Sequence, residues 1–276
     1  MKKIIVPTDF SEEAENALRV AADISRENDG EIFLLHLLDL PLHLSNNAGG
    51  QLPEAVFFQR LAQKKFNKLL AQDFLKGVKI HGDVETGAAY SGIMDTVERY
   101  NADLIVMGSH GADGIKDRYI GSNVEKVVRN SEVPVLVIKD RKERLEVNDL
   151  VFATDLNPHS INVLKEANDF ATKTNCKLHL VYINTPSRFL TTRQAQNKIK
   201  EYLEVTDIEP ADFNIYNAKS IEKGVFNFVQ DTKGDIIALG IKGRRGLSHF
   251  FNGSKSGDMV NRSTVPVITF RIKENS

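Results

Sequence analysis

Glycine and serine recur at fixed places in a loop of this sequence. Gly108, Gly111 and Gly121 are followed by Ser122, and the stretch comes directly after the apolar run 103–107. A glycine-rich loop that leaves a buried strand and enters a helix can bring backbone N–H groups close to an anion, because glycine has no Cβ in the way. The spacing therefore predicts a phosphate-binding loop.

The same loop occurs a second time. Its residues are Gly240, Gly243, Gly253 and Ser254. Residues 103–139 and 235–271 align without a gap, with 12 of 37 positions identical, and residues 4–24 align with 150–170. The second copy is 14 residues shorter in its middle. The chain is thus a tandem duplication.

Each copy alternates apolar runs with segments of helical periodicity. In the first copy the runs that predict strands are 3–9, 31–39, 78–87, 103–107 and 133–139. The charged stretch 141–149 has the composition of a linker, so we predict one domain at 1–140 and another at 150–276. Alternating strands and helices predict an α/β fold in which each domain has a five-stranded parallel sheet with helices on both faces.

In such sheets ligands bind beyond the carboxyl ends of the strands, near the point where strand order reverses. This rule places three features of the first copy on one rim: Asp9, Leu37 and the Gly108 loop. The corresponding features of the second copy are Asp155, Ile183 and the Gly240 loop.

Two helices are predicted in more detail. A long helix is expected from Glu54 to Leu75, and its predicted apolar side comprises Val56, Leu61, Phe66, Leu69 and Leu70. Phe57 and Phe58 in this helix are expected in the core or at an interface. Ser122 and Glu125 have the spacing of a capping box, which would begin the helix after the first glycine loop.

Composition excludes several classes of protein. The 36 basic and 37 acidic residues nearly balance, so we expect neither nucleic acid nor membrane as a partner. The single cysteine, Cys176, cannot form a disulfide within the chain. No apolar run approaches the roughly 18 residues of a membrane span, and the start of the chain is typical of a strand rather than a signal peptide. We expect a cytoplasmic protein.

These motifs resemble those of the universal stress protein family. The family's first strand ends in P-x-D, which here is Pro7-Thr8-Asp9 and, in the second copy, Ala153-Thr154-Asp155. Its nucleotide-binding members carry G-x2-G-x9-G-[ST], which is intact in both copies, and V-P-V follows the last helix at 133–135 and 265–267. The resemblance covers almost the whole chain twice.

The resemblance implies two Rossmann-like domains of the adenine nucleotide alpha hydrolase-like type, each binding ATP, ADP or AMP. Mg²⁺ or Mn²⁺ would be held mainly by the phosphates, with no protein metal site. In the first copy the implied binding residues are Pro7, Thr8, Asp9, Leu37, Met107, Gly108, Gly111, Gly121, Ser122 and Asn123. In the second they are Ala153, Thr154, Asp155, Ile183, Leu239, Gly240, Gly243, Gly253, Ser254 and Lys255.

The two loops differ in charge. Between the second and third motif glycines, the second loop carries Arg244, Arg245 and His249 and no acid, whereas the first has two acids and two bases. Because a triphosphate is strongly anionic, we predict that the second site binds its phosphates more tightly.

The resemblance implies a stress-response or regulatory protein that binds ATP. The chain has no P-loop motif and no ordered set of nucleophile, base and orienting acid, so we predict no enzyme activity. Two alternatives stay open, a nucleotide-free interaction scaffold and a slow ATP hydrolase that acts as a timer.

Family members pair their final strands between two domains. We therefore predict an internal pseudo-dimer through residues 133–139 and 265–271, in which each edge strand covers the other. A homodimer of the whole chain and an unidentified protein partner are further expectations.

Overall fold

The computed structural model describes residues 1–39, 53–109, 120–139, 147–241, 259–260 and 262–272. In the first repeat the strands are β1 (Lys3–Pro7), β2 (Glu31–Leu38), β3 (Lys79–Thr86), β4 (Leu104–Gly108) and β5 (Val135–Ile138). Its helices are α1 (Glu12–Glu27), α3 (Pro53–Leu70), α4 (Ala89–Tyr100) and α5 (Ser122–Asn130), with a short turn of 3-10 helix, η1 (Asp73–Leu75).

The second repeat has the same order of strands. Its strands are β6 (Asp149–Thr154), β7 (Lys177–Asn184), β8 (Asp212–Asn217), β9 (Ile236–Ile241) and β10 (Val267–Arg271). Its helices are α6 (Ile161–Lys173), α7 (Thr192–Thr206) and α8 (Ile221–Thr232), and η2 (Pro158–Ser160) and η3 (Pro186–Arg188) are turns of 3-10 helix.

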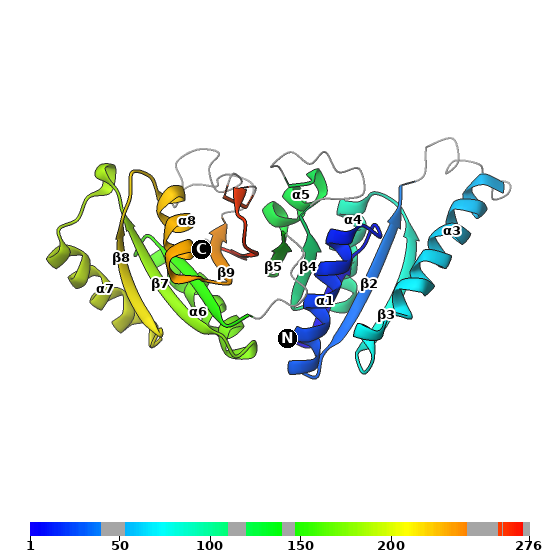
Figure 1. Ribbon diagram of the computed structural model, residues 1–276, viewed down its shortest axis with the longest axis horizontal. Coiled ribbons are helices and arrows are strands. Elements are labelled where there is room, and N and C mark those ends of the chain that lie inside the picture. The colour runs from blue at the N-terminus through cyan, green and yellow to red at the C-terminus, as the bar shows by residue number, and fades with distance from the viewer. Residues whose placement is uncertain (40–52, 110–119, 140–146, 242–258, 261, 273–276) are drawn as a thin grey trace.

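All ten strands form one sheet, in the order β3-β2-β1-β4-β5-β10-β9-β6-β7-β8. Strands within each repeat are parallel, as predicted. The two halves meet where β5 pairs antiparallel with β10, with Val267 opposite Val137 and Thr269 opposite Val135. The predicted pairing of the final strands is therefore present within the chain. Helices α3 and α7 form the two ends of the molecule (Figure 1).

Alternation along the strands divides the core between the two faces of the sheet. Ile4 and Val6 of β1 face a cluster that includes residues of α1 and α3, whereas Ile5 faces a cluster that includes residues of α4 and α5. Because both faces are covered, the inner strands are apolar almost throughout, which is why they could be recognised in the sequence. The edge strands β3 and β8 are more polar and only partly buried.

Ser11 caps the start of helix α1. The Ser11 side chain accepts a hydrogen bond from the Ala14 N–H, and three glutamates occupy the first turn, where the helix dipole favours negative charge. This start fixes the chain directly after β1, at the rim where the ligand site is predicted.

The prediction for the long helix is only partly correct. Helix α3 ends at Leu70 and is followed by η1, rather than continuing to Leu75. Phe66 and Leu69 are buried as predicted, but Leu61 and Leu70 are exposed. The inner face of α3 is therefore narrower than the sequence suggests.

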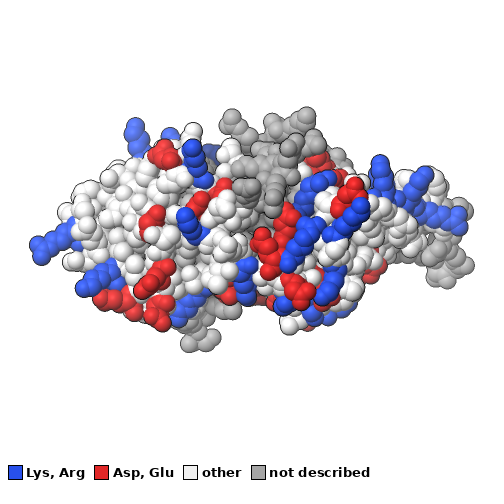
Figure 2. Space-filling model, turned by 60° about the horizontal axis from the view of Figure 1, so that its bottom comes forward, with Lys and Arg blue, Asp and Glu red and all other residues white. Residues whose placement is uncertain are grey.

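Charged side chains are interspersed over much of the surface. Figure 2 shows acids and bases side by side over the face that it presents, with a group of Lys and Arg at the right-hand end, over α3. This agrees with the near-zero net charge of the chain.

His179 joins three neighbouring strands of the second repeat. Its Nε2 lies 2.7 Å from Asp149 Oδ1 and its Nδ1 lies 2.8 Å from Asp212 Oδ2. Burial lowers the pKa of the imidazole, but the hydrogen bonds and charges of the two carboxylates outweigh burial, and the pKa is raised above 6.5.

We expect His179→Gln to destabilise the protein at acidic rather than alkaline pH. A folded-state pKa above the unfolded value gives stability that is complete below the unfolded pKa and is lost as pH rises through the folded pKa. For a partly exposed ion pair the loss is about 1 kcal/mol. Urea unfolding at about pH 5.5 and about pH 8.5 measures it. An equal difference between wild type and variant at both pH values would contradict the account.

Candidate functional site

The predicted site residues that the structure describes gather at the carboxyl ends of adjacent strands. Strand β1 lies between β2 and β4, so Asp9 follows β1 directly beside the ends of these two strands. Strand β6 lies between β7 and β9 in the same way, which places Asp155 beside the ends of β7 and β9. Each repeat therefore has one rim of the predicted kind.

Threonine and aspartate build the same turn after the first strand of each repeat. The Phe10 N–H donates to Thr8 Oγ1 at 3.1 Å, and the Ser11 N–H donates to Asp9 Oδ1 at 2.9 Å. Phe10 has a positive φ of 66°. These bonds hold the aspartate at the rim and explain its presence without a ligand.

The turn of the second repeat is a close copy. The Leu156 N–H donates to Thr154 Oγ1 at 3.0 Å, and the Asn157 N–H donates to Asp155 Oδ1 at 3.0 Å. Leu156 also has a positive φ, 58°. The change from Pro7 to Ala153 before this turn leaves both bonds in place.

The first glycine of each loop has a different environment in the two repeats. A Cβ on Gly108 would lie 2.7–2.9 Å from backbone atoms of Glu13 and Ala14, so β4 meets the first turn of α1 too closely for any side chain. A Cβ on Gly240 would meet only side-chain atoms of Ile272 and Val163, at 3.2–3.3 Å. Gly108 is thus explained by packing, and Gly240 is far less constrained.

The predicted capping box at Ser122 is wrong. Gly121 is the N-cap of α5, no side chain of the described residues caps this helix by a hydrogen bond, and the Glu125 carboxylate pairs with Arg129 at 2.6 Å. The Gly121 N–H donates to the Ser109 carbonyl, which ties the helix start to the end of β4. A helix start without a side-chain cap, with exposed Ser122 and half-buried Gly121 there, leaves N–H groups for an anion.

Several predicted residues are buried in the core. Met107, Leu239 and Ala153 belong to the hydrophobic cluster on the α4 and α8 side of the sheet, so only their main chains can reach the rim. Pro7 is half-buried at the end of β1, and Asn123 is exposed in the first turn of α5. Gly111, Gly243, Gly253, Ser254 and Lys255 lie outside the described residues, as do the basic residues of the second loop.

Leu37 and Ile183 each pack against a glycine of the following helix. A Cβ on Gly92 would lie 2.5 Å from Leu37 Cδ2, and a Cβ on Gly224 would lie 2.4 Å from Ile183 Cγ2. The sequence analysis missed these glycines. Each stands 16 residues before the first glycine of its loop, which is the signal that could have found them.

A pocket of about 400 Å³ occupies the predicted rim of the second repeat. Its lining residues are Thr154, Asp155, Asn157, Tyr182, Ile183, Arg188, Phe189, Leu190, Lys198 and Ile221. Three of these were predicted from the sequence. A larger hollow of about 610 Å³ lies along α7 and β8, away from the strand ends, and contains no predicted residue. The smaller pocket is therefore the candidate site.

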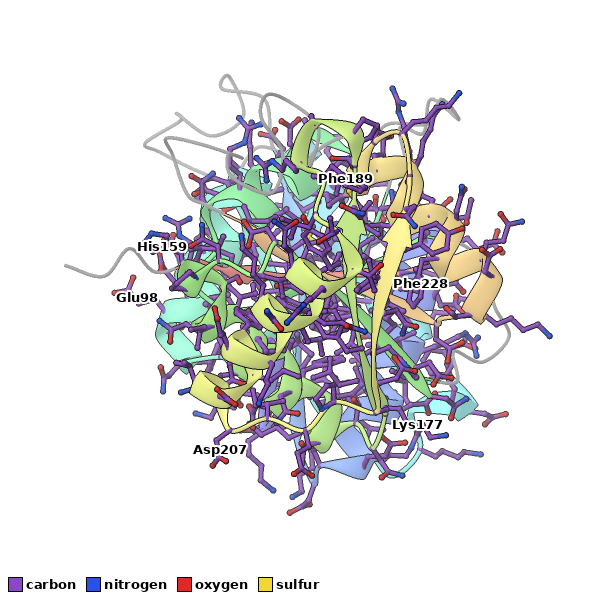
Figure 3. The ribbon with its side chains drawn as sticks, turned by 90° about the vertical axis from the view of Figure 1, so that its left-hand side faces the viewer. Glu98, His159, Lys177, Phe189, Asp207 and Phe228 are labelled. Atoms are coloured by element: carbon purple, nitrogen blue, oxygen red, sulfur yellow. The ribbon has the colours of Figure 1, made fainter. Side chains whose placement is uncertain are left out.

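One wall of this pocket is the segment that replaces the longer middle of the first repeat. The Asn184 side chain donates to the Leu190 carbonyl at 3.1 Å and accepts from the Leu190 N–H at 2.9 Å. The Tyr182 hydroxyl donates to the Arg188 carbonyl at 3.0 Å. These bonds fix the wall of the pocket. In Figure 3, Phe189 of this wall lies at the opposite end of the view from Asp207, the residue that follows α7.

Two phenols close to the pocket are held as neutral hydroxyls. Burial raises the pKa of Tyr182, and the Asp155 carboxylate raises it further, against the opposing charge of Arg188. Burial likewise raises the pKa of Tyr202, whose hydroxyl lies 2.7 Å from Ser160 Oγ. Both groups can therefore act as hydrogen-bond donors at neutral pH.

The described residues give no support for a protein-bound metal. No group of three or more His, Cys, Asp and Glu side chains among them could hold an ion. His36, at the end of β2, lies with its Nδ1 2.7 Å from the Thr8 carbonyl and its ring 4.3 Å from that of Phe10, which fits a structural role. Within the same residues no helix is long and apolar enough to cross a membrane.

Comparison with known proteins gives a consistent result. The model of the universal stress protein family matches residues 1–139 and again 147–271. Universal stress protein MJ0531 of Methanocaldococcus jannaschii is 33% identical over 145 residues, covering 51% of this chain and 84% of that protein. Universal stress protein Slr1230 of Synechocystis is 22% identical over 298 residues, covering 98% and 100%.

The solved structures agree on the fold. A universal stress protein from Archaeoglobus fulgidus matches with a TM-score of 0.72 and 22% identity, covering 99% of this chain and 97% of that one. Because the family model spans both repeats, the chain belongs to the universal stress protein family, as a tandem member.

Proposed function

We propose that this protein binds an adenine nucleotide at the rim of each repeat and serves as a nucleotide-dependent regulator rather than as an enzyme. The observation that supports this most is the pocket of the second repeat. Thr154, Asp155 and Ile183, which the family resemblance implies as binding residues, line that one pocket at the strand ends.

The pocket offers suitable chemistry for a nucleoside. Ile183, Ile221 and Phe189 provide an apolar surface for a planar base, and Asp155 provides a carboxylate that can accept hydrogen bonds from ribose hydroxyls. A ligand placed in this way directs its phosphates toward the end of β9 at Gly240. A divalent cation would then be carried by the phosphates.

In the first repeat the corresponding groups are Asp9, Gly108 and the start of α5. Exposed residues of the first turn of α5 carry N–H groups that no side chain in the described part of the chain caps, and the helix dipole favours an anion there. We propose that this end of α5 receives the phosphates of the first nucleotide.

The scaffold alternative also has a specific observation in its favour. The aspartates cap turns and Gly108 is required by packing, so these residues have structural roles that need no nucleotide. A direct measurement of binding separates the two functions.

A tryptophan reporter provides such a measurement. The chain has no tryptophan, so Phe189→Trp places a single tryptophan, which can be excited selectively over tyrosine, in the pocket wall. We expect ATP to quench its emission saturably, because the base stacks against the indole. Val205→Trp is the matched control: the two wild-type side chains are 66% and 67% exposed, and Val205 is near the far end of α7. Unchanged emission from Phe189→Trp at saturating ATP would contradict the proposed base position.

A further inference from the structure

Helix α3 presents apolar side chains to solvent. Of the six large hydrophobic residues that are exposed in the described part of the chain, four lie on this helix. Phe57 is 61% exposed, Phe58 45% and Leu61 42%. Ala62, Phe66 and Leu69 are buried on the side that packs toward the sheet, so the fold does not require the outer apolar residues.

Basic side chains continue the same outer face. Phe57, Leu61, Lys64 and Lys68 follow one another at i, i+4, i+7 and i+11, which places them in one row along the helix. Arg60, Lys64 and Lys68 are exposed, and none of them pairs with an acid among the described residues. The outer face of α3 is thus apolar in its first half and cationic in its second.

The equivalent helix of the second repeat lacks this character. On α7 the only large exposed hydrophobic residue is Val205, and the three bases are accompanied by two acids, Glu201 and Glu204. Lys200 pairs with Glu204 at 3.7 Å. Since both helices occupy the same position in the fold, the outer face of α3 is not a consequence of the architecture.

The position of α3 allows it to meet a broad surface. It forms one end of the molecule, outside the edge strand β3 (Figure 1), and its Lys and Arg side chains project from that end (Figure 2). A convex, protruding helix can lay its whole outer row against a flat surface.

We propose that the outer face of α3 binds the surface of an anionic phospholipid membrane. Aromatic and aliphatic side chains would enter the boundary between headgroups and acyl chains while the lysines contact lipid phosphates, as in interfacial amphipathic helices. The net charge of the whole chain is close to zero and so does not reveal this local cluster of basic side chains. The helix lies on the membrane and does not cross it, in accord with the lack of a spanning helix among the described residues.

Other occupants fit the charges less well. A second copy docked through the same face would bring two sets of three cations together, which is unfavourable. Lysine is depleted at protein–protein interfaces, whereas phenylalanine with lysine is characteristic of membrane-surface helices. These two points favour lipid over protein.

Vesicle flotation tests the proposal. Full-length protein is mixed either with phosphatidylcholine vesicles or with vesicles that also contain phosphatidylglycerol. We expect binding only to the second kind, weakened by salt. Lys64→Gln with Lys68→Gln should lower the apparent affinity about 25-fold, since each lysine near the surface contributes roughly fivefold. Phe57→Ser with Phe58→Ser should also release the protein.

The α7 variant Arg193→Gln with Lys200→Gln is the matched control, because it removes the same charge from exposed positions of the equivalent helix. It should bind as wild type does, and thermal unfolding verifies that all variants are folded. Failure of the wild type to bind anionic vesicles, or equal losses in the α3 and α7 variants, would overturn the proposal. The proposal would also be overturned if the wild type bound no vesicles but dimerised with rising concentration, and the Phe57 and Phe58 substitutions abolished the dimer. The outer face of α3 would then bind a second copy of the chain.

Discussion

Gly108→Ala is expected to lower the free energy of unfolding by about 2–3 kcal/mol, and Gly240→Ala by less than about 1 kcal/mol. The added methyl at Gly108 would meet the backbone of Glu13 and Ala14 at 2.7–2.9 Å, and a helix start cannot move away without disturbing α1. At Gly240 the methyl meets the flexible ends of Ile272 and Val163 at 3.2–3.3 Å.

Urea unfolding of the two variants, followed by circular dichroism, measures this difference. Gly240→Ala serves as the matched control, because the two glycines hold the same place in the two loops. Similar losses in both variants would show that close packing against α1 is not what requires glycine at Gly108.

Asp155→Ala is expected to lower the affinity of the second site for ATP about 10- to 100-fold. A ribose hydroxyl that donates to a carboxylate contributes about 1.5–3 kcal/mol, and the variant leaves that hydroxyl without an acceptor in the pocket. Asp9→Ala should have the same effect at the first site only. Calorimetric titration of each single variant and of the double variant measures both sites.

A second substitution separates the two roles of this aspartate. In Asp155→Asn the amide oxygen can still accept the Asn157 N–H that caps the turn, but the amide NH₂ cannot accept from ribose. Asp155→Asn should therefore retain the stability of the wild type and lose affinity as Asp155→Ala does. Wild-type affinity in Asp155→Asn would leave the aspartate with a role in the turn alone.

The fold followed from the sequence because the relevant signals are local and repeated. Strands buried on both faces appear as unbroken apolar runs, and Ser11 and Asn157, residue types that favour N-caps, precede their helical segments. The duplication strengthened each assignment, since every turn and loop had a second copy. The pairing of β5 with β10 followed from the need to cover two open sheet edges.

Competition between partners explains what the sequence did not predict. Glu125 has the spacing for a capping box, but Arg129 lies one turn further along α5 and takes the carboxylate. Leu61 and Leu70 fit a helical apolar pattern, yet α3 packs mainly on β2 and β3, and its outer residues remain exposed.

The pocket wall could not be predicted for a similar reason. Its shape depends on how Asn184 and Tyr182 bond to the main chain of Leu190 and Arg188. These contacts involve residues outside the motif. Phe189 was therefore not among the predicted binding residues. Ile183 was predicted, because it lies near the carboxyl end of β7.

Calorimetric titration of the purified full-length protein with ATP tests the central claim most directly, combined with analysis of nucleotide released on denaturation. We predict two sites per chain, counting any nucleotide that co-purifies, with the tighter site lost in Asp155→Ala and the weaker one in Asp9→Ala. No heat of binding together with no adenine nucleotide in the denatured extract would contradict nucleotide binding and leave the scaffold function.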